Sequence, residues 1–243
     1  PLRLAKGAAF RHHPAMTAHR FTLASTALTA LPSGALWWEE RRLLCVSDLH
    51  LGKSERLARR GGALLPPYET RETLSRLDAV IEQTRPDTVI CLGDSFDDLT
   101  AAATLPEAER LWLARLMAGR DWVWIEGNHD AGPVDIGGSH RAEVTLGRLT
   151  FRHIAAPATT AEVSGHYHPK LRLGGQSRPC FLLDAHRLIE PRVERLAGQF
   201  RDLAIADRQR IVEEALEARD LAGAADTDLG TVWEETAGDW ALD

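Results

Sequence analysis

The sequence predicts an α/β fold, in which short apolar strands alternate with amphipathic helices. Three observations indicate this class. Apolar runs of strand length recur along the chain, helical patterns separate several of them, and each main run ends at a residue that can bind a metal ion. In open α/β sheets ligands bind at the strand ends and in the loops that follow. The same pattern therefore also predicts where a functional site would lie.

Five runs are predicted as strands because they are dense in β-branched and aliphatic residues. They are RLLCVSD, DTVICLGD, DWVWIEGN, RLTFRH and AEVSGHYH, at residues 42–48, 87–94, 121–128, 148–153 and 161–168. The first two end at Asp, the third at Asn and the last two at His. Earlier in the chain, FTLASTALTALPSGALWW, residues 21–38, also favours β structure, because Ser and Thr interrupt its apolar character.

Two segments are predicted as helices. Residues 68–84, YETRETLSRLDAVIEQT, carry apolar side chains at helical spacing and are followed by Pro86, which cannot continue a helix. Residues 106–119, PEAERLWLARLMAG, begin with a proline and reach a stop signal at Gly119. The first helix lies between the first two predicted strands, as expected for an α/β arrangement.

The chain of 243 residues is long enough for one large domain with an appendage. We expect residues 1–15 to be an upstream extension, residues 16–190 to form the main domain and residues 191–243 to form an acidic, partly helical tail. The tail holds six arginines and thirteen acidic residues, a net charge of −7, and the rest of the chain is nearly neutral. The main domain therefore lacks the overall basic charge that is typical of nucleic-acid-binding proteins.

Cysteine usage and hydropathy favour a cytoplasmic protein. The three cysteines have no paired spacing, and Cys45 and Cys91 lie inside apolar runs, where a reduced, buried thiol is expected. No apolar stretch approaches the roughly 20 residues that a membrane span needs. Residues 21–38 could pass for a short secretory leader, but their composition suits β structure better.

The end of the first predicted strand raises the question of metal binding. An extended backbone would place Asp48 and His50, two residues apart, on the same side of the chain. Alone this pair is weak evidence, because an Asp that closes a strand is more often a cap for the next turn. The interpretation strengthens because similar groups recur at the later strand ends: Asp94 in GDSFDD, Asn128 in GNHD, and His166 with His168 in GHYHP.

Together these groups offer oxygen and imidazole ligands without a thiolate. Such a mixture suits Mn²⁺, Fe²⁺, Zn²⁺ or Mg²⁺ and argues against a structural zinc site built on cysteines. The number of ligands exceeds the need of one tetrahedral ion. Two ions that share one carboxylate are the natural solution, and this arrangement is used for in-line displacement at phosphorus.

The ordered set DLH, GDSFD, GNHD, an intervening His and GHYH resembles the calcineurin-like metallophosphoesterase family over roughly residues 43–170. The resemblance implies a four-layer α/β/β/α sandwich with the metal site at the strand ends, two divalent metal ions with Mn²⁺ expected first, and hydrolysis of phosphate esters. The implied ligands are Asp48, His50 and His168 for one ion, Asp94 as the bridge, and Asn128, His153 and His166 for the other.

Two choices remain within this assignment. His153, at a strand end, is favoured as the intervening ligand over His140, which lies in a Gly-rich loop. His129 is left for catalysis, where the resemblance implies that it stabilises or protonates the leaving oxygen. Asp97 is its expected partner, because a buried carboxylate fixes the tautomer of an imidazole and supports its charged form. Asp98 and Asp130 are expected to be supporting or capping groups.

A closer resemblance, over roughly residues 20–190, is to bacterial DNA-ligase-associated endonucleases of the PdeM type, which act in the DNA damage response. It implies DNA as the substrate and a functional association with a DNA ligase and a helicase. A basic cluster beside the metals could receive the nucleic-acid backbone, although a solvated charged helix face explains it equally well. The cluster consists of Lys53, Arg56, Arg59 and Arg60.

Two other functional classes were weighed against this prediction. A phosphodiesterase or phosphatase of small metabolites or nucleotides is the main alternative, because the metal ligands do not distinguish the substrates. A metal-free scaffold that kept the fold as a binding module is disfavoured, because none of the expected ligands is missing from the sequence.

Overall fold

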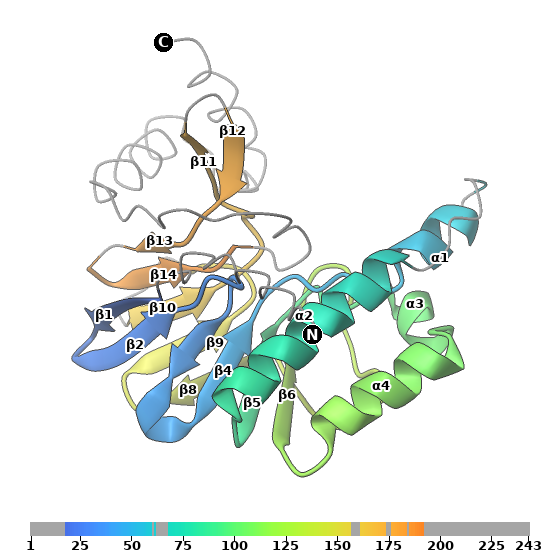
Figure 1. The fold of residues 1–243 in the computed structure, drawn as a ribbon, viewed down its shortest axis with the longest axis horizontal. Coiled ribbons are helices and arrows are strands. Elements are labelled where there is room, and N and C mark those ends of the chain that lie inside the picture. The colour runs from blue at the N-terminus through green and yellow to red at the C-terminus, as the bar shows by residue number, and fades with distance from the viewer. Residues whose placement is uncertain are drawn as a thin grey trace, which may run out of the picture.

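Two β-sheets packed face to face form the body of the protein (Figure 1). The computed structural model describes residues 18–59, 61, 68–156, 161–173, 176–183 and 185–191. The expected upstream extension and nearly all of the expected acidic tail, including its predicted helix, lie outside the described residues.

The first sheet has seven strands in the spatial order of the sequence. They are β1 (His19–Leu23), β2 (Thr26–Ala30), β3 (Leu36–Trp38), β4 (Leu43–Val46), β5 (Thr88–Leu92), β6 (Asp121–Ile125) and β7 (Ser139–Arg141). β1 to β4 are antiparallel, which confirms the β structure expected in residues 21–38. β4 to β7 are parallel, so the carboxyl ends of these strands lie at the same edge of the sheet.

The second sheet has five strands in the order β13-β14-β10-β9-β8. Their bounds are β8 (Glu143–Leu146), β9 (Leu149–Arg152), β10 (Ala161–Ser164), β13 (Leu182–Leu183) and β14 (Arg187–Ile189). β9, β10 and β14 are parallel to one another. β11 (Lys170–Leu173) and β12 (Gln176–Pro179) pair only with each other and form a separate two-stranded ribbon.

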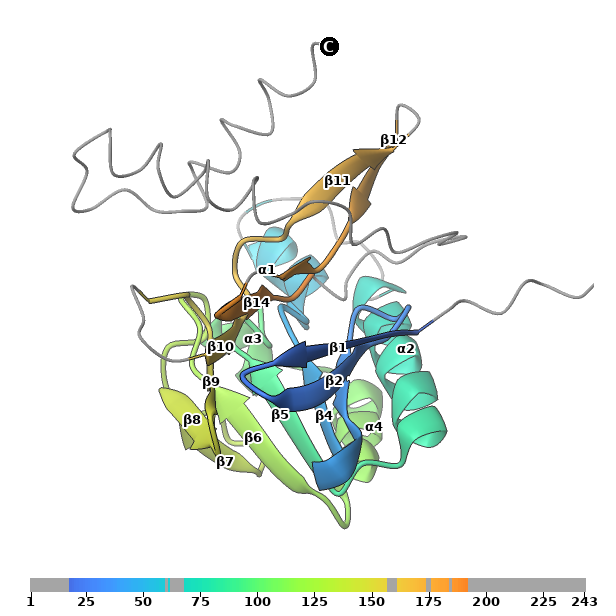
Figure 2. The same ribbon diagram turned by 90° about the vertical axis from the view of Figure 1, so that its left-hand side faces the viewer.

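The helices are η1 (Glu39–Arg41), α1 (Lys53–Arg59), α2 (Tyr68–Thr84), α3 (Leu99–Ala103) and α4 (Glu107–Met117). α2 and α4 lie side by side against the outer face of the first sheet (Figures 1 and 2). All five predicted strands and both predicted helices are confirmed. The helix layer and the two sheets supply three of the four expected layers, and no helix among the described residues covers the outer face of the second sheet. In the same part of the chain no helix is long and apolar enough to span a membrane.

Two apolar cores hold these layers together, one on each face of the first sheet. Alternate residues of a strand point to opposite faces, so Val89 and Cys91 of β5 contact the helix layer, whereas Ile90 and Leu92 pack against the second sheet. Cys45 and Cys91 are buried and form no disulfide. This burial on both faces explains why the central strands read as nearly continuous apolar runs.

The carboxyl ends of strands from both sheets meet at one edge of the sandwich. The loop after β4 contacts the loop after β5. The N–H of His50 donates to the Asp94 carbonyl at 2.9 Å, and Leu51 and Phe96 form an isolated parallel β-bridge. The loop after β10 binds the loop after β9, since the N–H of Gly165 donates to the His153 carbonyl at 3.0 Å, and it binds the loop after β4, since the N–H of His166 donates to Oδ2 of Asp48 at 3.0 Å. The predicted metal ligands follow these strands.

Glu190, directly after β14, is fully buried beneath this edge. Its backbone N–H donates to the Ser164 carbonyl at 2.7 Å, but neither carboxylate oxygen makes a well-formed hydrogen bond with a described residue. Burial raises the pKa of Glu190 to about 8, against the opposing effect of the Cys45 thiol, and the charge of Asp48 makes a still smaller raising contribution. The folded protein therefore retains a proton here that the unfolded chain loses at lower pH.

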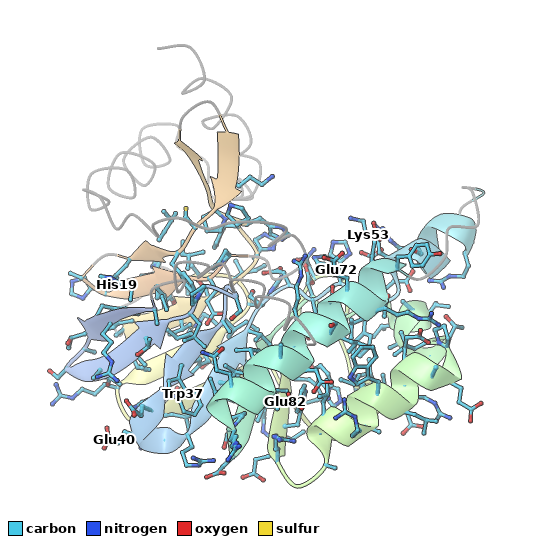
Figure 3. All side chains as sticks on the ribbon, viewed as in Figure 1. His19, Trp37, Glu40, Lys53, Glu72 and Glu82 are labelled. Carbon is cyan, nitrogen blue, oxygen red and sulfur yellow. The ribbon has the colours of Figure 1, made fainter. Side chains whose placement is uncertain are left out.

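This proton predicts a pH-dependent stability. Between the usual pKa of a glutamate and the raised value, unfolding releases the proton, so stability falls as pH rises through this window. We expect the free energy of unfolding of the metal-free protein to fall between about pH 5 and about pH 8 by about 3 kcal/mol more than that of Glu190→Gln. Denaturant titration with a chelator present measures this. Glu82→Gln, at an exposed position of α2 (Figure 3), should follow the wild type. Equal losses in Glu190→Gln and the wild type would contradict the assignment.

Candidate metal centre

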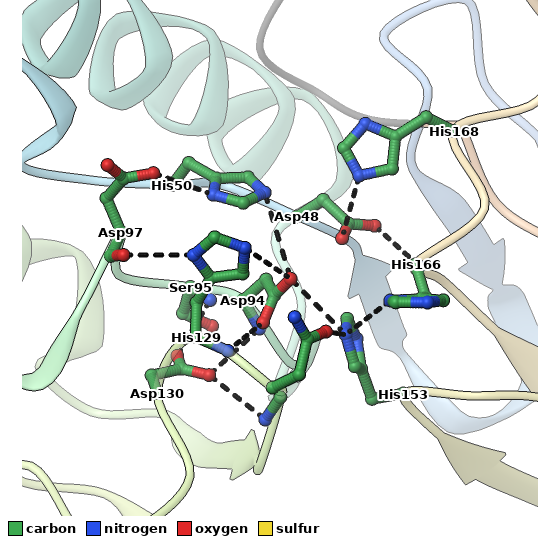
Figure 4. A network of polar contacts seen from close by, with 12 residues as sticks. Asp48, His50, Asp94, Ser95, Asp97, His129, Asp130, His153, His166 and His168 are labelled. Carbon is green, nitrogen blue, oxygen red and sulfur yellow. Dashed lines mark hydrogen bonds and ion pairs between the residues drawn. The ribbon is translucent and has the colours of Figure 1, made fainter. Parts of the chain in front are cut away.

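The first group of candidate ligands joins the loop after β4 to the loop after β10 (Figure 4). One ligand atom each from Asp48, His50 and His168 lies within 4.8 Å of the other two. Oδ1 of Asp48 is 3.3 Å from Nε2 of His168. Burial raises the pKa of the Asp48 carboxyl, but the hydrogen bond and charge of His168 outweigh it and hold that pKa well below its usual range. Asp48 is therefore held as a buried carboxylate.

The second group surrounds His153. Asp94, His153 and His166 have ligand atoms within 4.8 Å of one another. Nε2 of His153 lies 3.3 Å from Oδ2 of Asp94, 2.9 Å from Oδ1 of Asn128 and 3.2 Å from Nδ1 of His166. Asp94, Asn128 and His166 thus converge on one nitrogen of His153. His140, the alternative to His153, lies on β7 with Nε2 3.2 Å from the Val134 carbonyl and belongs to neither group.

The tautomer of His153 shows why this place suits a cation. Its Nδ1 is 2.7 Å from the carbonyl oxygen of Leu92, which can only accept, so Nδ1 carries the hydrogen. In the neutral ring, Nε2 then presents a lone pair to Oδ1 of Asn128 and Oδ2 of Asp94. The lone pair of Nε2 and those of the two oxygens repel one another unless a proton or a cation lies between the nitrogen and the oxygens. Burial lowers the pKa of His153, but the hydrogen bond of Asp94 and the charges of Asp48 and Asp94 outweigh it and raise that pKa. The donors therefore fit a divalent metal ion.

Asp94 connects the two groups. Its Oδ2 lies 3.9 Å from Nε2 of His50, 3.3 Å from Nε2 of His153 and 4.0 Å from Nε2 of His129. Its Oδ1 accepts the backbone N–H of His129 at 2.9 Å. Burial raises the pKa of Asp94, but the hydrogen bond and charge of His153 and the backbone hydrogen bond of His129 together outweigh burial and lower that pKa. A single carboxylate oxygen thus faces histidines of both groups, as a bridging ligand requires.

The backbone at the ligands differs from the expected extended chain. Strands β4 and β10 end at Val46 and Ser164, before the ligand residues begin. Five ligands instead have a left-handed φ of 45° to 70°: Asp48, His50, Asp94, His166 and His168. The explanation from strand alternation was therefore wrong, although the side chains do converge. This conformation costs an L-residue roughly 1–2 kcal/mol, so the surrounding structure must hold it.

Asp130 supplies much of that support. Its buried carboxylate accepts the backbone N–H groups of Asp94, Ser95, Phe96 and Gly127 at 2.8 to 3.1 Å. Burial and the charge of Asp94 raise the pKa of Asp130, against the effect of these hydrogen bonds. The capping role expected for Asp130 is thus present, and it acts on the loop that carries the central ligand.

Close approach of the loops requires glycine at several positions, of which Gly165 and Gly93 are examples. A Cβ at Gly165 would lie 1.8 Å from Oγ of Ser47, and a Cβ at Gly93 would lie 2.6 Å from the His153 ring. Real Cβ atoms do not approach neighbours this closely. The Ser47 hydroxyl also donates to Oδ2 of Asp48, a support that nothing in the sequence singled out.

The expected pairing of the Asp97 carboxylate with His129 is not present. Nδ1 of His129 donates to the backbone carbonyl of Asp97 at 3.0 Å, whereas the carboxylate contacts Nδ1 of His50 at 3.1 Å and forms an ion pair with Arg56. Burial raises the pKa of Asp97, but His50 and Arg56 outweigh it and lower the pKa. Asp97 therefore orients a metal ligand with its side chain and His129 with its backbone.

The described arginines of the predicted basic cluster form ion pairs with aspartates at the same edge of the sandwich. Lys53 begins α1 (Figure 3) and is half-buried. Arg56 pairs with Asp97, and Arg59 makes two hydrogen bonds to Asp98 at 2.7 and 2.8 Å. Arg60 lies outside the described residues. The two described arginines thus tie α1 to the site, since acidic groups that the sequence places 39 and 41 residues away fold against them.

The role of Asp97 yields a test that is independent of catalysis. Asp97→Asn should lower the affinity for Mn²⁺ by roughly 10- to 100-fold, because the carboxylate no longer fixes the ring of His50. Calorimetric metal titration measures this. Asp98→Asn changes the neighbouring aspartate, which caps α3 and contacts Arg59 but no histidine in the structure, and should retain the wild-type affinity. Equal affinities in Asp97→Asn and the wild type would show that this contact does not support metal binding.

Comparisons with known proteins agree with this geometry. Residues 41–214 match the family model described as calcineurin-like phosphoesterase. The crystal structure of the nuclease MPE of Pseudomonas putida is similar, with 28% sequence identity and a TM-score of 0.63, and the match covers 79% of this chain and 94% of that chain. A search of curated proteins finds no significant match. Since the family model covers most of the chain, including every candidate ligand, this protein belongs to the calcineurin-like phosphoesterase family.

Proposed function

We propose that this protein is a metal-dependent phosphodiesterase that cleaves DNA. The general part, metal-dependent hydrolysis of phosphate esters, follows from the family and from the clustered histidines and aspartates. The nuclease title of the similar Pseudomonas putida structure supports the choice of DNA. A role in DNA repair, together with a DNA ligase and a helicase, belongs to the same proposal and rests on the sequence resemblance. A cytoplasmic location also belongs to it and rests on the unpaired cysteines of the sequence.

The observation that carries the proposal is the position of Asp94 between two groups of ligands. Asp48, His50 and His168 would hold one divalent ion, and Asn128, His153 and His166 the other. When bound, such ions supply electrophilic stabilisation of the phosphoryl oxygens and activation of water. Oxygen and imidazole donors without thiolate make Mn²⁺ our first choice, with Fe²⁺, Zn²⁺ and Mg²⁺ as alternatives.

His129 has the geometry of a proton donor to the leaving oxygen. Its Nδ1 hydrogen is used by the Asp97 carbonyl, so Nε2 is the atom that faces the site, 4.0 Å from Oδ2 of Asp94. Its side chain is 32% exposed, against 6% for His50 and 4% for His153. A substrate can therefore reach this ring, whereas the two buried rings are positioned to hold metal. The protonated ring would deliver its Nε2 hydrogen as the phosphorus–oxygen bond breaks.

Hydrolysis of small phosphate esters is the second candidate. The observation that favours it is the engagement of Arg56 and Arg59 with Asp97 and Asp98, which leaves these two cations less able to bind a nucleic-acid backbone. Both candidates use the same metal centre and differ only in the substrate.

Two substitutions separate metal binding from proton donation. We expect the purified protein with Mn²⁺ to hydrolyse a bis-aryl phosphate diester. Asp94→Ala should abolish both turnover and tight metal binding, because the shared ligand is lost. His129→Ala should retain the metal but lose about 10²- to 10⁴-fold in kcat, the usual contribution of a general acid. His140→Ala, a histidine outside both groups, should behave as wild type. Normal turnover by the first two variants would refute the assignment of the centre.

A substrate panel decides between the two candidates. With Mn²⁺ and wild-type protein, we expect cleavage of single- or double-stranded DNA, with weaker hydrolysis of nucleoside monophosphates and cyclic nucleotides. His129→Ala prepared in parallel shows whether any cleavage comes from a contaminating nuclease. Diester hydrolysis without cleavage of any DNA would exclude the nuclease and favour the small-molecule activity.

A further inference from the structure

The ribbon formed by β11 and β12 begins directly beside the candidate metal ligands. β11 starts at Lys170, two residues after His168. The N–H of Cys180 donates to the Pro169 carbonyl at 2.9 Å and closes the base of the ribbon. Beyond that base the two strands pair only with each other and stand away from the two sheets (Figures 1 and 2). The ribbon is therefore an arm anchored at the metal centre.

The charge of this arm differs from that of the whole protein. The full chain carries a net charge of −6, yet residues 163–183 contain no Asp or Glu. The same segment contains three residues with permanent positive charge, and all three lie in β11 or β12: Lys170, Arg172 and Arg178. The arm thus supplies positive charge with no acidic residue of its own to neutralise it.

The strand register shows which of these basic residues share a face of the ribbon. Lys170 is exposed, and Arg172 lies two positions further along β11, so both positions belong to one face of the ribbon, about 7 Å apart. Pro179 and Ser177 occupy the opposite positions on β12. Arg178 pairs in register with Leu171 and belongs to the other face. One face therefore presents two successive cationic positions that lead away from the metal centre.

We propose that the β11–β12 ribbon is a DNA-binding arm in which Lys170 and Arg172 contact phosphates of the strand cleaved at the metal centre. This inference rests on the proposed nuclease function and names the residues that would recognise its substrate. Contacts to phosphates are independent of base sequence and provide much of the affinity of such proteins for DNA. A two-stranded ribbon is also narrow enough to follow a duplex groove.

The arm takes over the role that the sequence suggested for the cations of α1. Arg56 and Arg59 are held by aspartates that belong to the site itself. The ribbon, by contrast, joins the site through the ligand loop and extends outward from it. A small phosphate ester bound at the metals has no need of cations along an arm, whereas a polymer with successive phosphates does.

Charge-matched double variants test this inference. Lys170→Gln with Arg172→Gln removes two positive charges from the arm, and Arg110→Gln with Arg148→Gln removes two from exposed positions on α4 and the β8–β9 turn. We expect the arm variant to lose about tenfold in kcat/KM on single-stranded DNA at about 50 mM salt, with a much smaller loss on the bis-aryl diester. The control variant should match the wild type on both substrates. Lys170→Arg with Arg172→Lys should restore cleavage of DNA.

Salt dependence provides a second measurement. On single-stranded DNA, two lost phosphate contacts should make the slope of log kcat/KM against log salt, between about 50 and about 200 mM, shallower by about 1.4 units. Wild-type cleavage of DNA with equal slopes and rates in the arm and control variants would overturn the inference. Equal losses on DNA and the small diester would also overturn it, since they would indicate damage to the centre. Absence of DNA cleavage by the wild type would instead overturn the nuclease function itself.

Discussion

The buried carboxylate of Asp130 accepts the N–H groups of three successive residues, Asp94, Ser95 and Phe96, and a fourth from Gly127. These bonds fix the loop after β5 in a conformation that includes a left-handed Asp94. Because Asp94 is held in this way, its Oδ2 lies among histidines from three other loops. Each of those histidines is oriented from its other ring nitrogen or from its backbone. The centre therefore depends on a carboxylate that belongs to neither candidate ligand group.

The buried carboxylates of the centre are stabilised by neighbouring positive charge, as they would be by bound metal ions. Burial alone would favour neutral carboxyl groups, yet the pKa values of Asp48, Asp94 and Asp97 are all lowered because histidines and an arginine lie against them. The raised pKa of His153 is the other side of the same balance. In the absence of metal, a proton on His153 offsets part of the buried negative charge. Divalent ions would take over that role, which couples metal binding to proton release.

Positive charge at this edge of the molecule serves two different purposes. The arginines of α1 neutralise Asp97 and Asp98 and so join a short helix to the site. Their cost of desolvation is offset within the protein, which leaves little of their charge for a ligand. The basic residues of the β11–β12 ribbon lie in a segment that contains no acidic residue. The two sets are close in composition, and the aspartates that pair with Arg56 and Arg59 identify these two arginines as structural cations.

The sequence by itself determined the five main strands, the two long helices and the chemistry of the site. Strand and helix periodicity are local, and the motif residues carry their ligand type with them, so the candidate ligands could be named before any fold was known. The tertiary structure placed His153 rather than His140 beside Asp94 and His166, placed the Asp97 carboxylate on His50 rather than His129, and gave five candidate ligands a left-handed backbone. These features depend on contacts between distant loops, such as the bond from His166 to Asp48, which spans 118 residues. No local pattern specifies which donor meets which acceptor across that separation, because the packing of the two sheets sets it.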